Sequence, residues 1–279
     1  MKKYLVIGNP IDHSLSPKLH NHWIKENNID AVYEKKQLNE IGIERIIDEV
    51  RSGKIDGVNV TVPFKELVIP FLTKLTPLAD ETRSVNTIYR EDKNGVDAVI
   101  GDNTDVGGFI ESLKHINYNL KNKEVFILGA GGVVPSILKA LEILEVGRVV
   151  ISNRTRRKAE ELQKRWHINV RLNKIINWGQ VPDYNMPDMI INATSLGLKK
   201  DDQIELDYKK LKPKFFGKKK LFYDLIYNPK ETNFLEKGKE LGQDTVNGKM
   251  MFIYQARLAF KIWHNILPKI NDETFKLLD

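Results

Sequence analysis

Short apolar runs alternate with helical patterns along most of this chain. The runs cover residues 4–7, 56–62, 125–128, 149–152, 188–192 and 221–225. Between them, apolar residues recur every three or four positions, the spacing of a helix that buries one face. Strands that alternate with helices are typical of parallel α/β proteins, so the pattern predicts an α/β fold.

A longer helical pattern stands near the end of the chain. Its apolar stripe ends before Pro268 and comprises Met251, Phe252, Ala256, Ala259, Phe260, Trp263 and Leu267. Gln255 lies in the middle of this stripe, where a buried amide needs a hydrogen-bond partner. It either caps a buried backbone group or points into a cleft.

A glycine-rich loop separates the strand predicted at 125–128 from a helical pattern. The loop consists of Gly129, Ala130, Gly131 and Gly132. Glycine permits the tight turn and close approach that a pyrophosphate requires, and the phosphate charge is favoured at a helix amino terminus. The flanking strand and helix therefore predict a Rossmann-type domain. The fingerprint departs from its usual form at Val134, where a third small residue is expected, and Pro135 follows in the first helical turn.

Basic residues follow the strand predicted at 149–152, where an NAD site would place an acidic residue. The segment contains Asn153, Arg154, Thr155, Arg156, Arg157 and Lys158. Arginine binds phosphate through paired hydrogen bonds, whereas a carboxylate would repel it. The alternative is a merely basic helix start, which the helix dipole disfavours. The segment predicts NADP rather than NAD.

Residues 59–65 place a lysine directly after a strand-like run. Asn59 and Thr61 share one face of an extended strand, and Pro63 ends it because proline lacks an N–H. A partly desolvated ammonium beside a carboxylate can exchange protons near neutral pH, which makes Lys65 a candidate proton donor. The alternative is a solvated lysine that opens a helix.

Two further segments carry candidate polar groups. Ser14 and Ser16 stand two apart in the loop of residues 8–17, so their hydroxyls can reach one carboxylate, or they cap the following helix. Asp105 lies in the glycine-rich segment 101–108, near which we expect a domain boundary. It either pairs with Lys65 or caps the next helix.

Composition narrows the class of protein. With 279 residues and 41% apolar content, the chain can bury the cores of two domains. It has no cysteine, which agrees with a reducing compartment, and we expect a cytoplasmic protein. The first apolar run reaches Gly8 and Pro10 too soon for a secretory leader, and no run approaches the roughly 18 residues of a spanning helix.

The formal charge of +7 favours anionic partners in general. We interpret the lysine runs at 199–200 and 218–220 as solvated turns before strands, and neither contains aromatic residues that could stack on bases. We therefore expect neither nucleic acid nor a membrane as a partner. His20 and His22 lack the spacing of a zinc motif, so we interpret them as packing or solvated polarity and expect no metal.

Taken together, these segments resemble the shikimate dehydrogenase family in order over almost the whole chain. The matching motifs are residues 8–17, 59–65, 85–87, 103–105, 129–132, 153–155, 192–195, 224–227 and Gln255. The resemblance implies reversible NADPH-dependent reduction of 3-dehydroshikimate to shikimate, a step in chorismate and aromatic amino acid biosynthesis. It implies an N-terminal α/β substrate domain of residues 1–104 and about 249–279, toward which the C-terminal helix packs back. Residues 105–248 would form the Rossmann-type NADP domain of a monomer or homodimer.

The resemblance also implies roles for individual residues. Lys65 and Asp105 match the catalytic pair. The positions that match substrate ligands are Ser14, Ser16, Thr61, Asn86, Gln255 and Tyr227. The positions that match cofactor contacts are Gly129, Ala130, Gly131, Gly132, Val133, Asn153, Arg154, Thr155, Lys158, Leu225 and Gly248.

Departures from the family pattern keep alternatives open. Val133 and Val134 replace residues that are usually small, which bears on cofactor affinity. Ser14 and Ser16 resemble the shikimate-specific branch, so quinate is the weaker candidate substrate. A folate-linked one-carbon unit is another candidate for the same architecture. A nonenzymatic NADP-binding sensor would bind the cofactor without turnover, and the coexistence of Lys65 with an aspartate partner disfavours it.

Overall fold

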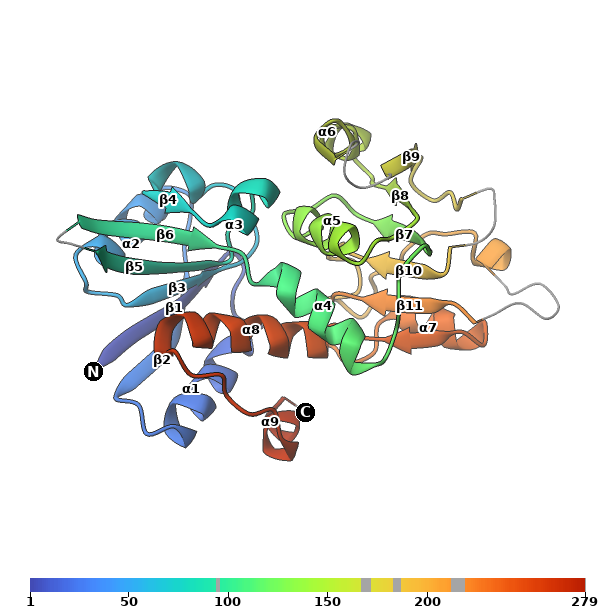
Figure 1. Cartoon of the computed structure of the whole chain (residues 1–279). Coiled ribbons are helices and arrows are strands. Elements are labelled where there is room, and N and C mark those ends of the chain that lie inside the picture. The colour runs from blue at the N-terminus through green and yellow to red at the C-terminus, as the bar shows by residue number, and fades with distance from the viewer. Residues whose placement is uncertain (94–95, 167–171, 183–186, 212–218, 279) are drawn as a thin grey trace. The chain divides into compact units, whose positions relative to one another are not determined.

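The computed structural model describes residues 1–93, 96–166, 172–182, 187–211 and 219–278. The chain divides into two compact units (Figure 1). The N-terminal unit comprises Met1–Gly108 and Ile253–Asp279, and the central unit comprises Phe109–Phe252. Of the helices in the described ranges, none is long and apolar enough to cross a membrane.

A mixed six-stranded sheet forms the centre of the N-terminal unit. Its strands lie in the order β2-β1-β3-β5-β6-β4. They are β1 Lys2–Gly8, β2 Ala31–Gln37, β3 Gly57–Val60, β4 Lys74–Leu75, β5 Thr87–Lys93 and β6 Val96–Asp102. β1 pairs with β2 and β3 in parallel, whereas β5 is antiparallel to both β3 and β6. The parallel arrangement expected from the sequence therefore describes β1 to β3, and the antiparallel β5 was not predicted.

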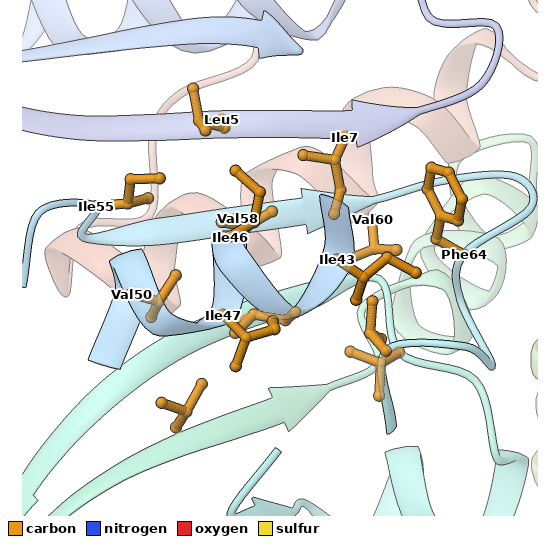
Figure 2. Packing of buried hydrophobic residues seen from close by; sticks show 14 of the residues in the cluster. Leu5, Ile7, Ile43, Ile46, Ile47, Val50, Ile55, Val58, Val60 and Phe64 are labelled. Carbon is orange, nitrogen blue, oxygen red and sulfur yellow. The ribbon is translucent and has the colours of Figure 1, made fainter. Parts of the chain in front are cut away.

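One face of this sheet is covered by α2, Gly42–Arg51 (Figure 2). Ile43 and Ile47 of this helix pack with Leu5 and Val58 of the sheet in one apolar cluster. These side chains are at most 3% exposed, so the helical spacing of the isoleucines is explained by their burial.

Aromatic side chains cover the opposite face. They come from α1, Ser16–Glu26, from β1 and β2, and from α8, Lys249–His264. Trp263 of α8 donates its indole N–H to the carbonyl of Ile88 at 3.2 Å. A Cβ on Gly57 would collide with that indole, which explains the glycine in β3. The C-terminal helix thus packs on the N-terminal unit, as expected.

The remaining helical segments of the N-terminal unit are short. α3 covers Pro77–Thr82, α9 covers Asp272–Leu277, and the 3-10 turn η1 covers Ile69–Phe71. The longer α4, Asp105–His115, begins in the N-terminal unit and continues into the first residues of the central unit.

The sheet of the central unit is entirely parallel, in the order β12-β11-β10-β7-β8-β9. Its strands are β7 Glu124–Leu128, β8 Arg148–Ser152, β9 Leu172–Ile176, β10 Met189–Asn192, β11 Leu221–Asp224 and β12 Asp244–Val246. The helical segments are α5 Val134–Ile143, α6 Arg156–Trp166, α7 Asn233–Glu240 and η2 Tyr208–Leu211. Counted from β9, the strands follow the Rossmann order 3-2-1-4-5-6. The chain adds strands toward one edge from β7 to β9 and toward the other edge from β10 to β12, so the strand order reverses between β7 and β10. Ligands of such sheets bind outside the carboxyl ends of the strands at that point.

Two predictions about local structure were wrong. The strand predicted at 56–62 ends at Val60, so Thr61 and Val62 lie in the turn that follows. Lys220 was predicted to be solvated, but it is only 7% exposed and donates to the carbonyl of Pro187 at 2.8 Å. Burial lowers its pKa. Lys219 is exposed, and Lys218 lies outside the described residues.

Candidate active site

A buried ion pair joins two segments of the N-terminal unit. Lys65 lies in the turn after β3, and its Nζ is 2.5 Å from Oδ2 of Asp105, the first residue of α4. The two residues are only 8% and 5% exposed. The interpretation of Lys65 as a solvated lysine at a helix start is therefore wrong. A lysine and a carboxylate in direct contact and shielded from water are suited to proton transfer.

The second oxygen of Asp105 is also bound. Asn86 donates from Nδ2 to Asp105 Oδ1 at 3.0 Å. The backbone N–H of Val106, in the first turn of α4, donates to Oδ1 of Asn103 at 3.2 Å. Asn103 therefore caps α4, which was the alternative role considered for Asp105. The carboxylate of Asp105 faces Lys65 and Asn86.

Asn86 connects this pair to helix α8. Its Oδ1 accepts the backbone N–H of Thr104 at 2.8 Å, which fixes the orientation of the amide. Its Nδ2 lies 3.3 Å from Oε1 of Gln255 in α8. The structure thus brings Lys65, Asn86, Asp105 and Gln255 into one polar cluster of the N-terminal unit, and Gln255 points toward that cluster.

The loop of residues 8–17, called the serine loop here, lies beside residues 59–65 because backbone hydrogen bonds tie the two segments together. Thr61 N donates to the carbonyl of Ile7 at 2.9 Å, and Asn9 N donates to that of Val62 at 3.0 Å. A Cβ on Gly8 would lie 2.5 Å from Cγ2 of Thr61, so only glycine permits this approach. The end of β1 and the end of β3 consequently deliver their loops side by side.

Ser14 and Ser16 stand at the start of α1. Leu15 occupies the cap position and makes no side-chain capping bond, while Ser14 Oγ accepts the N–H of Ser16 at 3.3 Å. Ser14 therefore has a local structural contact, and Ser16 is 6% exposed. Neither hydroxyl forms a regular side-chain cap on α1, which leaves both compatible with a ligand role.

In the central unit, the glycine loop follows β7 at the point where the strand order reverses. Gly129 has a φ of +110°, and a Cβ there would lie 2.8 Å from the carbonyl oxygen of Ala193. Gly131 differs, because a Cβ would meet no atom closer than that oxygen at 4.0 Å. The protein packs tightly around Gly129 and leaves room over Gly131, as a loop that receives a pyrophosphate requires.

The helix after this loop begins at Val134, whose side chain is fully buried. Pro135 occupies the first turn of the helix, and Val133 at the cap position is half-buried. Val134, which stands in place of a small residue, therefore packs into the interior of the central unit. Its effect on cofactor affinity stays a prediction.

The basic segment after β8 divides into paired and unpaired cations. Arg156 binds Glu160 and Asn177, and Arg157 binds Glu161 at 2.9 Å. Arg154 and Lys158 are exposed and have no side-chain partner among the residues that the structure describes. Asn153 donates to the carbonyl of Thr155 at 2.7 Å, which shapes the turn that carries Arg154.

Tyr227, Leu225 and Gly248 adjoin one another after β11. Gly248 N donates to the carbonyl of Ile226 at 3.0 Å, and a Cβ on Gly248 would collide with the carbonyl of Leu225. The ring of Tyr227 stacks on that of Phe252 with centroids 4.3 Å apart. The structure therefore brings these three predicted residues to one loop cluster of the central unit.

Two of the matching motifs, residues 192–195 and 224–227, are joined by a buried hydrogen-bond network that was not predicted from the sequence. Asp224 Oδ1 accepts from Asn192 Nδ2 at 3.0 Å, and its Oδ2 accepts from Thr232 Oγ1 at 2.6 Å. Burial raises the pKa of Asp224 to about 6, although the hydrogen bonds to the carboxylate act in the opposite direction. Asn192 and Asp224 are the polar last residues of two buried strands, and this position is the sequence signal that could have indicated their contact.

One of the two histidines of α1, His20, packs in the interior of the N-terminal unit. His20 is 1% exposed and its ring lies parallel to that of Tyr33 with centroids 4.2 Å apart. Among the described residues, no group of three or more histidine, cysteine or acidic side chains is arranged to hold a metal ion.

A parallel sheet in the Rossmann order with a glycine loop at its reversal point defines a dinucleotide-binding α/β protein. The N-terminal unit adds a buried pair of a lysine and an aspartate, side chains of the kind that acid-base catalysis uses. Known proteins of this architecture specify the family.

Residues 6–88 match the model of the shikimate dehydrogenase substrate binding domain, and residues 111–205 match that of shikimate / quinate 5-dehydrogenase. A shikimate dehydrogenase (NADP(+)) from Pelagibacter ubique is 52% identical over 278 residues, which cover 100% of this chain and 99% of that protein. The crystal structure of shikimate dehydrogenase from Aquifex aeolicus is similar with a TM-score of 0.83 at 32% identity, covering 100% of this chain and 97% of that one. The Thermus thermophilus enzyme, solved in complex with NADP(H) and shikimate, gives a TM-score of 0.83 at 28% identity with the same coverage. This chain belongs to the shikimate dehydrogenase family.

Proposed function

We propose that this protein catalyses the reversible NADPH-dependent reduction of 3-dehydroshikimate to shikimate, as a step in chorismate and aromatic amino acid biosynthesis. The observation that carries the proposal is the buried Lys65–Asp105 pair, whose carboxylate is oriented by Asn86. Relatives that are shikimate dehydrogenases along their whole length support the same substrate. Quinate is not favoured.

Lys65 and Asp105 are the proposed catalytic residues. NADPH, when bound, supplies the hydride that reduces the substrate carbonyl. Lys65, as ammonium, donates a proton from Nζ to the oxygen of that carbonyl, while Asp105 holds the ammonium in place. In the direction of oxidation the same amine takes the proton back from the hydroxyl. Positioned proton transfer of this kind is worth about 10² to 10⁴ in rate.

The remaining polar groups of the N-terminal unit are proposed to bind the substrate. Ser14 and Ser16 would hold its carboxylate through their hydroxyls. Thr61, Asn86 and Gln255 would bind its ring hydroxyls, and the position of Asn86 and Gln255 beside the Lys65–Asp105 pair supports this assignment. Tyr227 of the central unit is proposed as a further group near the substrate.

The central unit is proposed to bind NADP. The room over Gly131 suits the pyrophosphate, and Gly129, Ala130, Gly132 and Val133 complete the loop. Arg154 and Lys158, which have no side-chain partner in the described part of the chain, would bind the adenosine 2′-phosphate, with Asn153 and Thr155 in the same turn. Leu225 and Gly248 would adjoin the nicotinamide.

We further propose the domain division at residues 104/105 and about 248/249. The compact units, which change at 108/109 and 252/253, support it. A cytoplasmic location and a monomeric or homodimeric state complete the proposal.

The direct test is NADP⁺ reduction with shikimate, with quinate and NAD⁺ as alternative substrate and cofactor. We expect shikimate and NADP⁺ to be preferred. Cofactor binding without turnover on any of these substrates would favour the nonenzymatic sensor, and turnover with quinate at a similar rate would favour the broader dehydrogenase.

Two substitutions test the role of Lys65. Lys65→Ala removes the amine, and Lys65→Arg keeps a positive charge but cannot release a proton at neutral pH. Both should lower kcat by roughly 10² or more while NADP⁺ binding is retained, because its site lies in the other unit. Lys114→Ala, which breaks an exposed pair with Glu111, is the matched control and should leave kcat unchanged. Full turnover in a folded Lys65→Arg protein would exclude Lys65 as the proton donor.

A further inference from the structure

A chain of buried hydrogen bonds extends from Asn86 into the interior of the N-terminal unit. It runs from the hydroxyl of Tyr33 through Asn59 and Thr87 to Asn86. We propose that Tyr33 and Thr87, linked by Asn59, are positioning residues that set the orientation of the Lys65–Asp105 pair. This inference rests on the proposed function of that pair.

Two backbone groups fix the direction of the chain. Asn59 Nδ2 lies 3.0 Å from the carbonyl oxygen of Asn86, which can only accept, so Asn59 must present Oδ1 to Tyr33. The Tyr33 hydroxyl therefore donates to that oxygen, at 2.7 Å. At the other end, Thr104 N can only donate, so Asn86 receives it on Oδ1 and turns Nδ2 toward Asp105.

Thr87 links the side-chain amides of Asn59 and Asn86, and the hydrogens are donated in the same direction. Its Oγ1 receives a hydrogen from Asn59 Nδ2 at 3.1 Å and lies 3.1 Å from Asn86 Oδ1, the nearer of its two acceptors. The strand register places Asn59 directly opposite Thr87, so this link is built into the pairing of β3 with β5. Each hydrogen in the chain is donated toward Asn86, and the last reaches the carboxylate of Asp105.

The consequence for the ion pair is geometric. Because Asn86 presents an N–H to Oδ1 of Asp105, that oxygen acts as an acceptor and Oδ2 is left to face Lys65. A rotation of the Asn86 amide would remove this donor and let the carboxylate turn. A misplacement of about 1 Å at reacting groups can cost about 10² in rate, so control of this orientation matters for turnover.

Burial excludes a direct role in ligand binding. Tyr33 is 1% exposed and Thr87 is 0% exposed, so neither side chain can touch a substrate in this fold. Any effect of their hydroxyls on turnover must pass through the chain. The ring of Tyr33 also stacks on His20, and Tyr33→Phe would keep that contact while removing only the hydroxyl.

The test compares Tyr33→Phe and Thr87→Val with a matched control, Tyr223→Phe. Tyr223 is equally buried, and its hydroxyl makes one buried hydrogen bond of 2.7 Å with Ser112, in the central unit. We expect kcat for shikimate oxidation to fall about five- to thirtyfold in the first two variants, with KM for shikimate and NADP⁺ changed by less than about twofold. Tyr223→Phe should lose similar thermal stability and keep its kcat.

A second readout does not need turnover. In protein labelled with ¹⁵N-asparagine, the side-chain amide signal of Asn86, assigned with an Asn86→Ser sample, should shift in Tyr33→Phe and Thr87→Val but not in Tyr223→Phe. If the wild-type protein fails to oxidise shikimate, the proposed function falls, and the amide signals still report whether the chain positions Asn86. If both variants keep wild-type kcat, or if Tyr223→Phe loses as much, the positioning role is refuted.

Discussion

Acid should destabilise the N-terminal unit through His20. This ring is 1% exposed, and neither nitrogen has a hydrogen-bond partner within the described part of the chain. Its pKa falls from 6.5 to about 3, first because burial disfavours the charged ring and second because His264 lies nearby. At about 1.36 kcal/mol per pKa unit, charging His20 in the folded state costs on the order of 5 kcal/mol.

The pH window follows from these values. Between pH 6.5 and about 3 the unfolded chain binds a proton that folded His20 does not, so stability is complete above pH 6.5 and is lost as the pH falls. At pH 5 the loss amounts to about 2 kcal/mol, a large part of a typical net stability of about 5–15 kcal/mol. His264 adds to the loss, since burial and then Lys2 lower its pKa to about 4, against an opposing effect of Asp56.

His20→Phe isolates the contribution of His20. Phenylalanine cannot titrate and keeps an aromatic ring against Tyr33, and any packing cost is the same at every pH. Hydrogen exchange of the amides of β1 and β2 measures the opening free energy of this unit at pH 8 and pH 5. The wild type should lose about 2 kcal/mol more than His20→Phe over that interval. His13→Gln, at an exposed histidine of the serine loop, should behave as the wild type.

An equal loss in the wild type and in His20→Phe would refute this reasoning. It would mean that other groups, such as His264, dominate the acid response. A larger loss in the variant would show that folding raises the pKa of His20 and that the folded state favours the charged ring, the opposite of what its burial implies.

The remaining predictions concern the two proposed sites and one buried carboxylate. Ser14→Ala combined with Ser16→Ala should raise KM for shikimate about tenfold or more, because a lost hydrogen bond to a charged group costs about 1.5 to 3 kcal/mol; an unchanged KM would leave the serines as elements of the α1 start. Arg154→Ala should reduce the preference for NADPH over NADH, whereas Arg157→Ala, whose guanidinium binds Glu161, should not; the opposite ranking in steady-state kinetics would move the phosphate site. For Asp224, whose pKa burial raises from 3.8 to about 6, stability should fall by on the order of 3 kcal/mol as pH rises through that window, the reverse of His20. Asp224→Asn should flatten this dependence in the exchange of β10 and β11 amides, and a wild-type slope in the variant would contradict the assignment.

The strands that the sequence predicted are the ones buried on both faces. β7, β10 and β11 are almost wholly buried, so their apolar runs are uninterrupted and easy to identify. The missed β2 lies at a sheet edge, where the sequence Tyr33-Glu34-Lys35-Lys36 alternates poorly because only part of the strand faces the interior. Charged side chains are favoured on such edges, where they prevent further strand pairing.

The candidate site was predictable as a set of residues and not as an arrangement. Lys65 and Asp105 each had a commoner alternative role, and only the folded chain brings their side chains together across 40 positions. The hydrogen bond of Tyr33 to Asn59, which starts the chain leading to Asp105, was not predictable at all. Tyr33 has no unusual sequence context, and its contact with Asn59 depends on the order in which β1, β2 and β3 pair.

The antiparallel strand β5 explains why these distant segments meet. β1, β3 and β6 run in one direction, and their carboxyl ends carry the serine loop, the Lys65 turn and Asp105. β5 runs the other way, so its amino end lies at the same edge and delivers Asn86, the residue just before Thr87. A parallel β5 would place Asn86 at the far edge of the sheet, away from the carboxylate that it orients. The strand reversal that the sequence did not predict is thus the feature that joins Asn86 to the proposed catalytic pair.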